Sequence, residues 1–198
     1  MQVKEIIINK FITTKRLSTY DDFDDYELNI KMSKDYYIPL AILEIALKNS
    51  INSIFERFYG AGWLTVGAQF LKGDLLEKIA VAKDKLTHRN ETITKDKLIA
   101  ELSFGFWTAL FQSPYKHQMR ISDLKQIFPN LPTKETDFID RKIISAKLDH
   151  IRKFRNRIFH YEKIVGKAEF DTIKEDIDEI LDYFDDEICD FAKRLNGE

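Results

Sequence analysis

The chain has 198 residues, of which 44% are hydrophobic and 32% charged, and its formal net charge is -2 at pH 7. This composition is that of a folded soluble protein long enough to bury the core of one domain, and it excludes a disordered tail. The near-neutral charge excludes a strong overall attraction to nucleic acid, so an anion site must be local. A single cysteine, Cys189, excludes an intramolecular disulfide and a thiol cluster for zinc.

Signal-peptide and membrane-spanning patterns are missing from the sequence. The N-terminus offers only Ile6-Ile7-Ile8 before Asn9, which is too short for the apolar region of a signal peptide. The longest apolar stretch, residues 102–111, is about half of the roughly 20 residues that a spanning helix needs. We therefore expect a cytoplasmic protein that does not contact a membrane, and the lone cysteine suits a reducing compartment.

Helical periodicity dominates the first two thirds of the chain, and strand alternation is almost absent. Apolar residues recur every three or four positions over residues 40–58, which predicts a helix with one buried face. The chain breaks at Gly60-Ala61-Gly62, and the same pattern predicts a second helix over residues 75–86. A further helix is expected to begin at Thr94 and to run through Leu110, and Pro114 prevents it from continuing.

The last third of the chain predicts three more helices. A short helix over residues 121–128 stops at Pro129, and a long helix is expected over residues 134–160. The last helix, within the acidic segment 167–195, has an apolar seam at near-heptad spacing. Because no low-complexity linker interrupts the chain, residues 1–198 are predicted to form one all-α domain, with additional helices at the N-terminus.

Charge is distributed unevenly along the last two predicted helices. Residues 141–157 hold seven basic residues and one acid, Asp149, whereas residues 171–190 hold ten acids and one basic residue, Lys174. One interpretation is that two neighbouring helices attract each other, and charge alone favours it. The other is a groove for RNA or phosphate along the basic helix.

The phase of the helix that ends at His160 singles out Arg155. This arginine is in line with the buried stripe, between Ile151 and Ile158, so we expect it to be partly desolvated. A buried charge normally has a carboxylate or a bound anion as its partner. The rim that would adjoin it collects Arg152, Asn156 and His160.

Each of these residues also has a purely structural interpretation. Arg155 can pair with an acid of the final helix, and His160 is a helix C-terminal residue whose cationic form the helix dipole favours. Glu44 and Lys48 form an i, i+4 pair that contributes about 0.2–0.5 kcal/mol to a helix. Alternatively, Glu44 anchors a site cation such as Arg155. Taken one at a time, the structural interpretations are favoured.

Other polar or aromatic residues give weaker indications of a functional site. The histidines His88, His117 and His150 share no close-spaced partner for a metal, and we expect them on the surface. The aromatic residues of segment 104–107 lie in a continuous apolar run, which favours core packing over a base-stacking platform. The sequence therefore predicts neither a metal site nor a cofactor.

In combination, the segment Arg155-Asn156-Arg157-Ile158-Phe159-His160 resembles the Arg-polar-x-x-x-His signature of the HEPN superfamily. Upstream blocks resemble its Abi-like branch, which is associated with bacterial abortive infection, and the ending is similar to Arg-Asn-Arg-x-x-His-x-Glu. The resemblance runs from about residue 36 to residue 162 and leaves out the first 30 residues and the acidic last helix. The blocks are Leu43-Glu44-Ile45-Ala46-Leu47-Lys48-Asn49, Tyr59-Gly60, Trp63 and Leu102-Ser103-Phe104-Gly105-Phe106-Trp107.

Two positions depart from the pattern of the branch. Lys48 stands where the branch often has arginine, which keeps the charge but loses bidentate recognition of an anion. Some relatives have a tyrosine two positions after the histidine, where a partner nucleotidyltransferase modifies them. Here that position is Glu162, with Tyr161 one residue earlier, so this mode of regulation is not expected.

The resemblance implies a HEPN-like helical bundle and a metal-independent RNA endonuclease, in which the RNA 2′-hydroxyl attacks its own phosphate. The residue types fit, because His160 can exchange protons near neutrality and the fork of Arg155 can contact two phosphoryl oxygens. Asn156 completes the implied catalytic set by orienting His160 or by donating to phosphate. The implied RNA-binding or supporting residues are Arg152, Lys153, Arg157, Glu162, Glu44, Lys48 and Asn49.

One chain supplies one histidine at this site, whereas a general acid and a general base need two proton carriers. A symmetric homodimer with a composite site solves this, as the resemblance also implies. The expected role is a toxin, or an effector of abortive infection against phage, with RNA as the substrate and a protein or RNA antitoxin as a further partner. The alternatives are a noncatalytic HEPN-type module that holds RNA or a regulator, and a helical oligomerisation protein.

Overall fold

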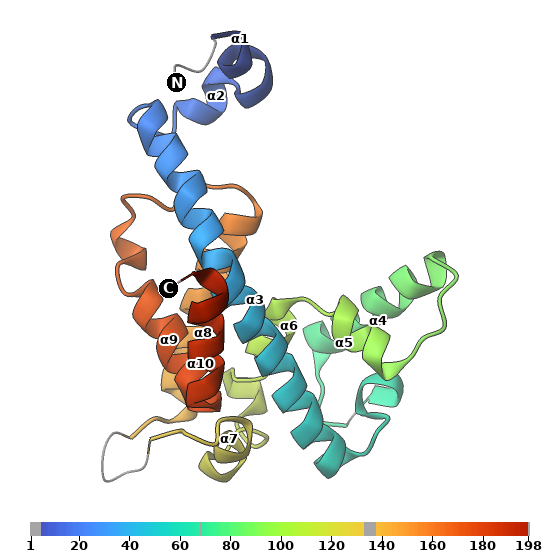
Figure 1. The fold of residues 1–198 in the computed structure, drawn as a ribbon. Coiled ribbons are helices and arrows are strands. Elements are labelled where there is room, and N and C mark those ends of the chain that lie inside the picture. The colour runs from blue at the N-terminus through green and yellow to red at the C-terminus, as the bar shows by residue number, and fades with distance from the viewer. Residues whose placement is uncertain (1–4, 68, 133–137, 198) are drawn as a thin grey trace.

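The computed structural model describes residues 5–67, 69–132 and 138–197 of the chain (Figure 1). Helices and loops make up all of this described part, which contains no strand. The prediction of an all-α fold is therefore confirmed. The short elements are α1 (Glu5–Ile7), α2 (Thr14–Leu17), the π-helical turns η1 (Ile8–Ile12) and η2 (Trp63–Gly67), and the 3₁₀ turns η3 (Ser113–Tyr115) and η4 (Ala168–Phe170).

The long helix α3 (Phe23–Tyr59) organises the fold. Its 37 residues span about 55 Å at 1.5 Å per residue, and the helix predicted over residues 40–58 is its second half. The carboxylate of Asp22 begins it by accepting a hydrogen bond of 2.8 Å from the backbone N–H of Asp25, and Gly60, with φ +84°, ends it. In Figure 1, α8, α9 and α10 lie on one side of α3, and α4 and α5 lie on the other, while α6 contacts both α3 and α8.

Between α3 and α7, one predicted helix is confirmed and one is wrong. The predicted helix over residues 75–86 is confirmed as α4 (Gly73–His88). The single helix predicted from Thr94 through Leu110 is wrong, because the chain forms α5 (Lys95–Glu101) and α6 (Phe104–Ala109), with an extended backbone at Leu102 and Ser103. The apolar residues of segment 102–111 cover all faces of a helix, so a straight helix would expose many of them. The break turns α6 into the core, where the aromatic residues of segment 104–107 are buried as predicted.

Helix α7 (Ile121–Ile127) agrees with the prediction, whereas α8 (Arg141–Phe159) begins seven residues later than predicted. The Asp140 carboxylate caps α8 by accepting hydrogen bonds from the backbone N–H groups of Lys142 (2.8 Å) and Ile143 (3.0 Å). Residues 138–140 are not helical, and residues 134–137 of the predicted helix lie outside the described residues.

The prediction of a single last helix with one continuous apolar seam is also wrong. The chain forms α9 (Ile173–Phe184) and α10 (Asp186–Asn196), separated by Asp185 in an extended conformation. After the break, α10 packs against α9 and α3 in a new direction. The last residues of the predicted seam, Phe191 and Leu195, therefore do not continue the buried face of α9. Accordingly, Phe191 is 40% and Leu195 48% exposed.

An ion-pair network joins the basic helix α8 to the acidic helix α9. The nearly buried carboxylate of Asp176 accepts hydrogen bonds from Lys147 Nζ (2.5 Å) and contacts His150 Nδ1 (2.7 Å). Lys147 also pairs with Glu179, and His150 Nε2 lies 2.6 Å from the carbonyl oxygen of Glu169. Attraction between neighbouring helices therefore explains part of the charge pattern. The prediction of a surface position is wrong for His150, which lies half-buried.

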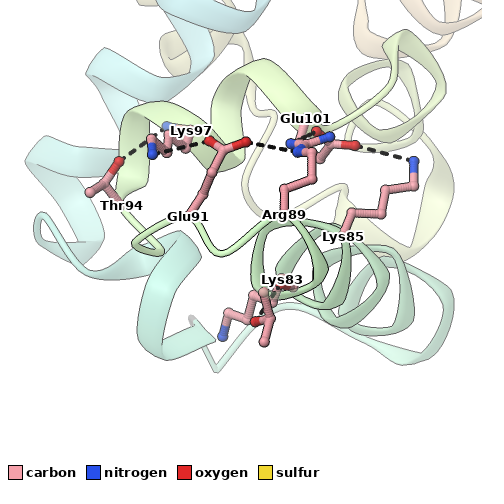
Figure 2. A network of polar contacts seen from close by, with 8 residues as sticks. Lys83, Lys85, Arg89, Glu91, Thr94, Lys97 and Glu101 are labelled. Carbon is pink, nitrogen blue, oxygen red and sulfur yellow. Dashed lines mark hydrogen bonds and ion pairs between the residues drawn. The ribbon is translucent and has the colours of Figure 1, made fainter.

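A second network fixes the corner between α4 and α5 (Figure 2). Arg89 pairs with Glu91 at 2.8 Å and with Glu101 at 2.6 Å, while Lys85 and Lys97 reach the same two carboxylates. Hydrogen bonds from these cations lower the pKa of both glutamates. Because the network lies near solvent, it contributes modestly to stability and mainly defines the path of the connecting loop.

Buried side chains from α3 to α10 form one hydrophobic cluster. Within the described ranges, α3 alone is long and apolar enough, by length and composition, to cross a membrane. The core helix of a soluble protein passes the same test, and the α3 residues Leu43, Leu47 and Ile51 are fully buried in the cluster.

The Asp176 network predicts a specific loss of stability. Asp176→Ala should lower the free energy of unfolding by about 3 kcal/mol, because it leaves Lys147 and His150 half-buried without their shared acceptor. Urea denaturation followed by circular dichroism measures this change. The control is Asp178→Ala in the same helix, whose carboxylate lies 3.9 Å from Lys174 and 3.8 Å from Lys193 and should cost less than about 1 kcal/mol. Equal losses in the two variants would contradict the role given to Asp176.

Candidate functional site

The predicted motif occupies the last turn of α8 and the residue that follows it. Helix α8 presents one buried stripe, formed by Ile144, Leu148, Ile151, Phe154 and Ile158. Arg155 is in phase with that stripe, as predicted, and His160 follows the helix as its C-cap. The backbone N–H of His160 donates to the carbonyl oxygen of Asn156 at 2.9 Å, so the backbone of the motif is fixed.

The side chain of Arg155 lies against α3. Its Nη2 atom is 3.2 Å from the Glu44 carboxylate, and the two side chains are 24% and 19% exposed. The guanidinium carbon also lies 4.2 Å from the centre of the Phe159 ring. Glu44 is therefore the anchor of Arg155, and the interpretation that paired Arg155 with an acid of the final helix is wrong.

The environment of Arg155 leaves one donor unused. Its Nε atom is buried and has no hydrogen-bond partner among the described residues. A buried guanidinium N–H without a partner costs free energy, so its position calls for an explanation such as stored strain, a catalytic role, or a bound water or ion. Near Glu44 on α3, Lys48 is half-buried and Asn49 is exposed.

Two neighbouring basic residues of α8 have a different carboxylate partner from Arg155. Arg152 Nη2 donates to Asp149 at 2.5 Å and its Cδ atom faces Gly105 of α6, and Lys153 pairs with the same aspartate at 2.9 Å. Asn156 lines a small pocket of about 240 Å³ together with Lys153 and Arg157. Arg157 and Glu162 line both this pocket and the cleft beside His160, so Asn156 and His160 adjoin each other, as the predicted rim requires.

Exposed His160 faces a larger cleft of about 560 Å³. No described contact joins its side chain to that of Arg155, which lies five residues earlier and about 140° away around an ideal helix. Arg157, on the wall of this cleft, pairs with Glu162 at 3.3 Å and with Glu169 at 3.6 Å. Glu162 therefore braces the loop after α8.

Asn29 holds this loop in place, and the sequence analysis missed it. The side chain is 1% exposed, and its Oδ1 accepts hydrogen bonds from the backbone N–H groups of Ile164 (2.7 Å) and Val165 (3.2 Å). Its Nδ2 donates to the carbonyl oxygen of Glu162 at 3.3 Å. A signal existed, because Asn29 is a polar residue at a position in phase with the buried stripe of α3 that continues to Leu40.

Asp25, one turn before Asn29, adds an ion pair to the same loop. Lys163 Nζ donates to the Asp25 carboxylate at 2.7 Å, and this hydrogen bond lowers the pKa of Asp25 and raises the pKa of Lys163. Tyr161 has a left-handed backbone with φ +57°, and its carbonyl oxygen accepts a hydrogen bond of 2.5 Å from Arg16. The loop after His160 is thus tied to α2 and to the first half of α3.

Within the described residues, no three His, Cys, Asp or Glu side chains are grouped closely enough to hold a metal ion. Comparisons of the chain with protein-family models, with curated proteins and with solved structures give no match. The HEPN resemblance and the roles that it implies therefore stay predictions, carried by the residues of segment 36–162.

Substitution of Asn29 tests whether it fixes the loop that follows His160. Asn29→Ala leaves two buried N–H groups without an acceptor, so it should lower the free energy of unfolding by about 2 kcal/mol and speed amide hydrogen exchange at residues 162–165. Asn29→Asp keeps the acceptor for Ile164 and Val165 and should protect their amides better than Asn29→Ala. Unchanged exchange in Asn29→Ala would show that the loop is held by other contacts.

Proposed function

We propose that the protein is a metal-independent RNA endonuclease of the Abi-like HEPN type, with a composite active site across a homodimer. The observation that carries the proposal is the setting of Arg155, a motif arginine anchored by Glu44 and Phe159 and with one unused buried donor. It lies five residues before an exposed histidine that caps the end of the same helix. Anchored in this way, the guanidinium is preorganised for the charge that develops on a phosphoryl group.

The proposed reaction is an attack of an RNA 2′-hydroxyl on the adjacent phosphate. One His160 takes the proton of the 2′-hydroxyl, the new O–P bond closes a 2′,3′-cyclic phosphate, and the bond to the 5′-oxygen breaks. A second proton carrier protonates the leaving 5′-oxygen. Arg155 stabilises the phosphoryl oxygens, and Asn156 orients His160 or donates to phosphate.

A second copy of the chain supplies the second proton carrier. Beside the motif is an apolar groove of about 710 Å³, whose exposed walls include Tyr37, Phe159, Tyr161 and Leu195. Exposed apolar surface of this kind marks interaction sites, and two of its residues belong to the motif region itself. A two-fold axis beside this groove would bring His160 of the partner subunit to the same RNA.

The biological role that we propose is that of a growth-arresting toxin or abortive-infection effector in the cytoplasm, held in check by a protein or RNA antitoxin. This biological role rests on the family resemblance, whereas the proposed reaction rests on Arg155, Asn156 and His160.

Cys189 takes no part in the proposed reaction. Burial raises the pKa of its thiol to about 11, so the reactive thiolate form is scarce near neutral pH.

A noncatalytic RNA-binding module is the second candidate. Arg155 and Arg157 both have carboxylate partners, Glu44 and Glu162, and paired arginines hold a fold together without any chemistry. This candidate keeps RNA binding at the same surface and predicts that no RNA is cut under any condition.

Cleavage assays in EDTA distinguish the two candidates. The wild type should cut single-stranded RNA, and His160→Ala should slow cleavage by about 10²–10⁴-fold, because a general acid or base contributes that much. Arg155→Lys, which keeps the charge but loses the planar fork, should also slow it. His88→Ala, at an exposed histidine that ends α4, is the matched control and should cut at the wild-type rate. Cleavage that survives both site substitutions, or that requires added divalent metal, would contradict the nuclease proposal.

The dimer has a test that leaves the motif intact. Leu195→Asp puts a charge into the apolar groove from α10, so it should turn a dimer into a monomer of 23.4 kDa and abolish cleavage. Light scattering after size exclusion measures the mass. Leu76→Asp, at a similarly exposed leucine of α4, should leave both mass and cleavage unchanged. A monomeric variant that cuts at the wild-type rate would contradict the composite site.

A further inference from the structure

The cleft beside His160 has a wall that the family resemblance does not include. Residues 13–20, which form α2 and its flanks, line one side, and residues 157–167 line the other. The hydrogen bond from Arg16 Nη1 to the carbonyl oxygen of Tyr161 joins the two walls at 2.5 Å. The N-terminal segment thus helps to build a cleft that opens at the end of α8.

The cleft is strongly basic although the chain as a whole is not. Its lining contains one acid, Glu162. Against it stand the cations Lys15, Arg16, Arg157, Lys163 and Lys167. A concave surface lined mainly by one sign of charge concentrates ligands of the opposite sign, so this cleft is the candidate for the local anion site that the near-neutral composition leaves room for.

These cations divide into two groups by their contacts. Lys163 pairs with Asp25, Arg157 pairs with two glutamates, and Arg16 holds the Tyr161 carbonyl, so these three build the walls. In the part of the chain that the structure describes, the side chains of Lys15 and Lys167 make no ion pair or hydrogen bond; Lys15 is exposed and Lys167 half-buried. Two cations on opposite walls are therefore available to a ligand.

Tyr161 adds a different kind of contact. Tyr161 lines the cleft and is 68% exposed, although its backbone is held in a left-handed conformation. An exposed aromatic ring beside a basic groove is the arrangement on which unpaired bases stack. A duplex offers no such base face, because its bases are already stacked on each other.

We propose that this cleft binds single-stranded RNA, with Lys15 and Lys167 on its phosphates and an unpaired base on the ring of Tyr161. The proposal deepens the nuclease function and rests on it for the reaction, since it defines how the strand approaches His160. Binding itself does not depend on cleavage. The N-terminal segment outside the resemblance thereby determines the substrate class, which is unpaired RNA.

A binding titration that involves no cleavage tests the cleft. The probe is a fluorescein-labelled 2′-O-methyl RNA, which has no free 2′-hydroxyl to attack, and anisotropy is followed at several salt concentrations. The double variant Lys15→Ala/Lys167→Ala should bind about tenfold more weakly, with a salt slope smaller by about 1.4, or 0.7 for each lost phosphate contact. Lys15→Arg/Lys167→Arg should restore both quantities.

The matched control removes two lysines elsewhere. Lys116→Ala/Lys125→Ala takes the same charge from exposed positions in and near α7, at the opposite end of α3 from α2 (Figure 1). It should bind like the wild type. Equal weakening in the two double variants would overturn the cleft, because binding would then follow total charge alone.

The ring and the strand state are tested in the same titration. Tyr161→Asn removes the ring but tolerates a left-handed backbone, and it should bind the single strand about tenfold more weakly. Tyr161→Phe should bind like the wild type. A duplex of the same sequence should bind more weakly than the single strand, and equal or tighter binding of the duplex would overturn the assignment.

Failure of this inference is distinguishable from failure of the proposed reaction. A wild type that cuts RNA, together with a Lys15→Ala/Lys167→Ala variant that binds normally, would overturn the cleft alone. A wild type that cuts no RNA, together with binding that depends on Lys15, Lys167 and Tyr161, would support the cleft and contradict the nuclease.

Discussion

The phase of α8 forces a charged side chain, Arg155, into its apolar stripe, and the ion pair with Glu44 is what makes this position tolerable. A guanidinium there without a carboxylate would cost several kcal/mol. The pair fixes α3 against the end of α8, and Asn29 and Asp25 on the first half of α3 fix the loop that follows. One long helix therefore sets the position of both ends of the motif.

This arrangement explains why the candidate site combines rigid and open parts. Arg155 is held from two sides, by Glu44 and by the Phe159 ring, whereas His160 is exposed to solvent. Preorganised charge and an accessible proton carrier are what phosphoryl chemistry needs. The apolar groove and the basic cleft both adjoin the same loop, so the proposed partner subunit and the proposed RNA strand would meet at the residues around Tyr161.

The sequence predicted the parts of the fold that local signals determine. Helices α4 and α7 have glycine, proline or a capping residue near their ends, and the partial burial of Arg155 followed from helical phase alone. The breaks at Leu102 and Asp185 were not predictable in this way, because apolar periodicity continues across both and tertiary packing decides where the chain turns. In the site, the Glu44 anchor was one of two open alternatives, and the role of Asn29 depends on a loop 133 residues away in the chain.

The chemistry at the end of α8 is tested most directly by the ends of the RNA products. Purified protein is incubated in EDTA with a labelled single-stranded RNA, and the termini of the fragments are identified by mass spectrometry. Attack by the 2′-hydroxyl, with His160 as proton carrier, requires a 2′,3′-cyclic phosphate on one fragment and a 5′-hydroxyl on the other. Fragments with a 3′-hydroxyl and a 5′-phosphate, or no cleavage by the dimer, would contradict the proposed active site.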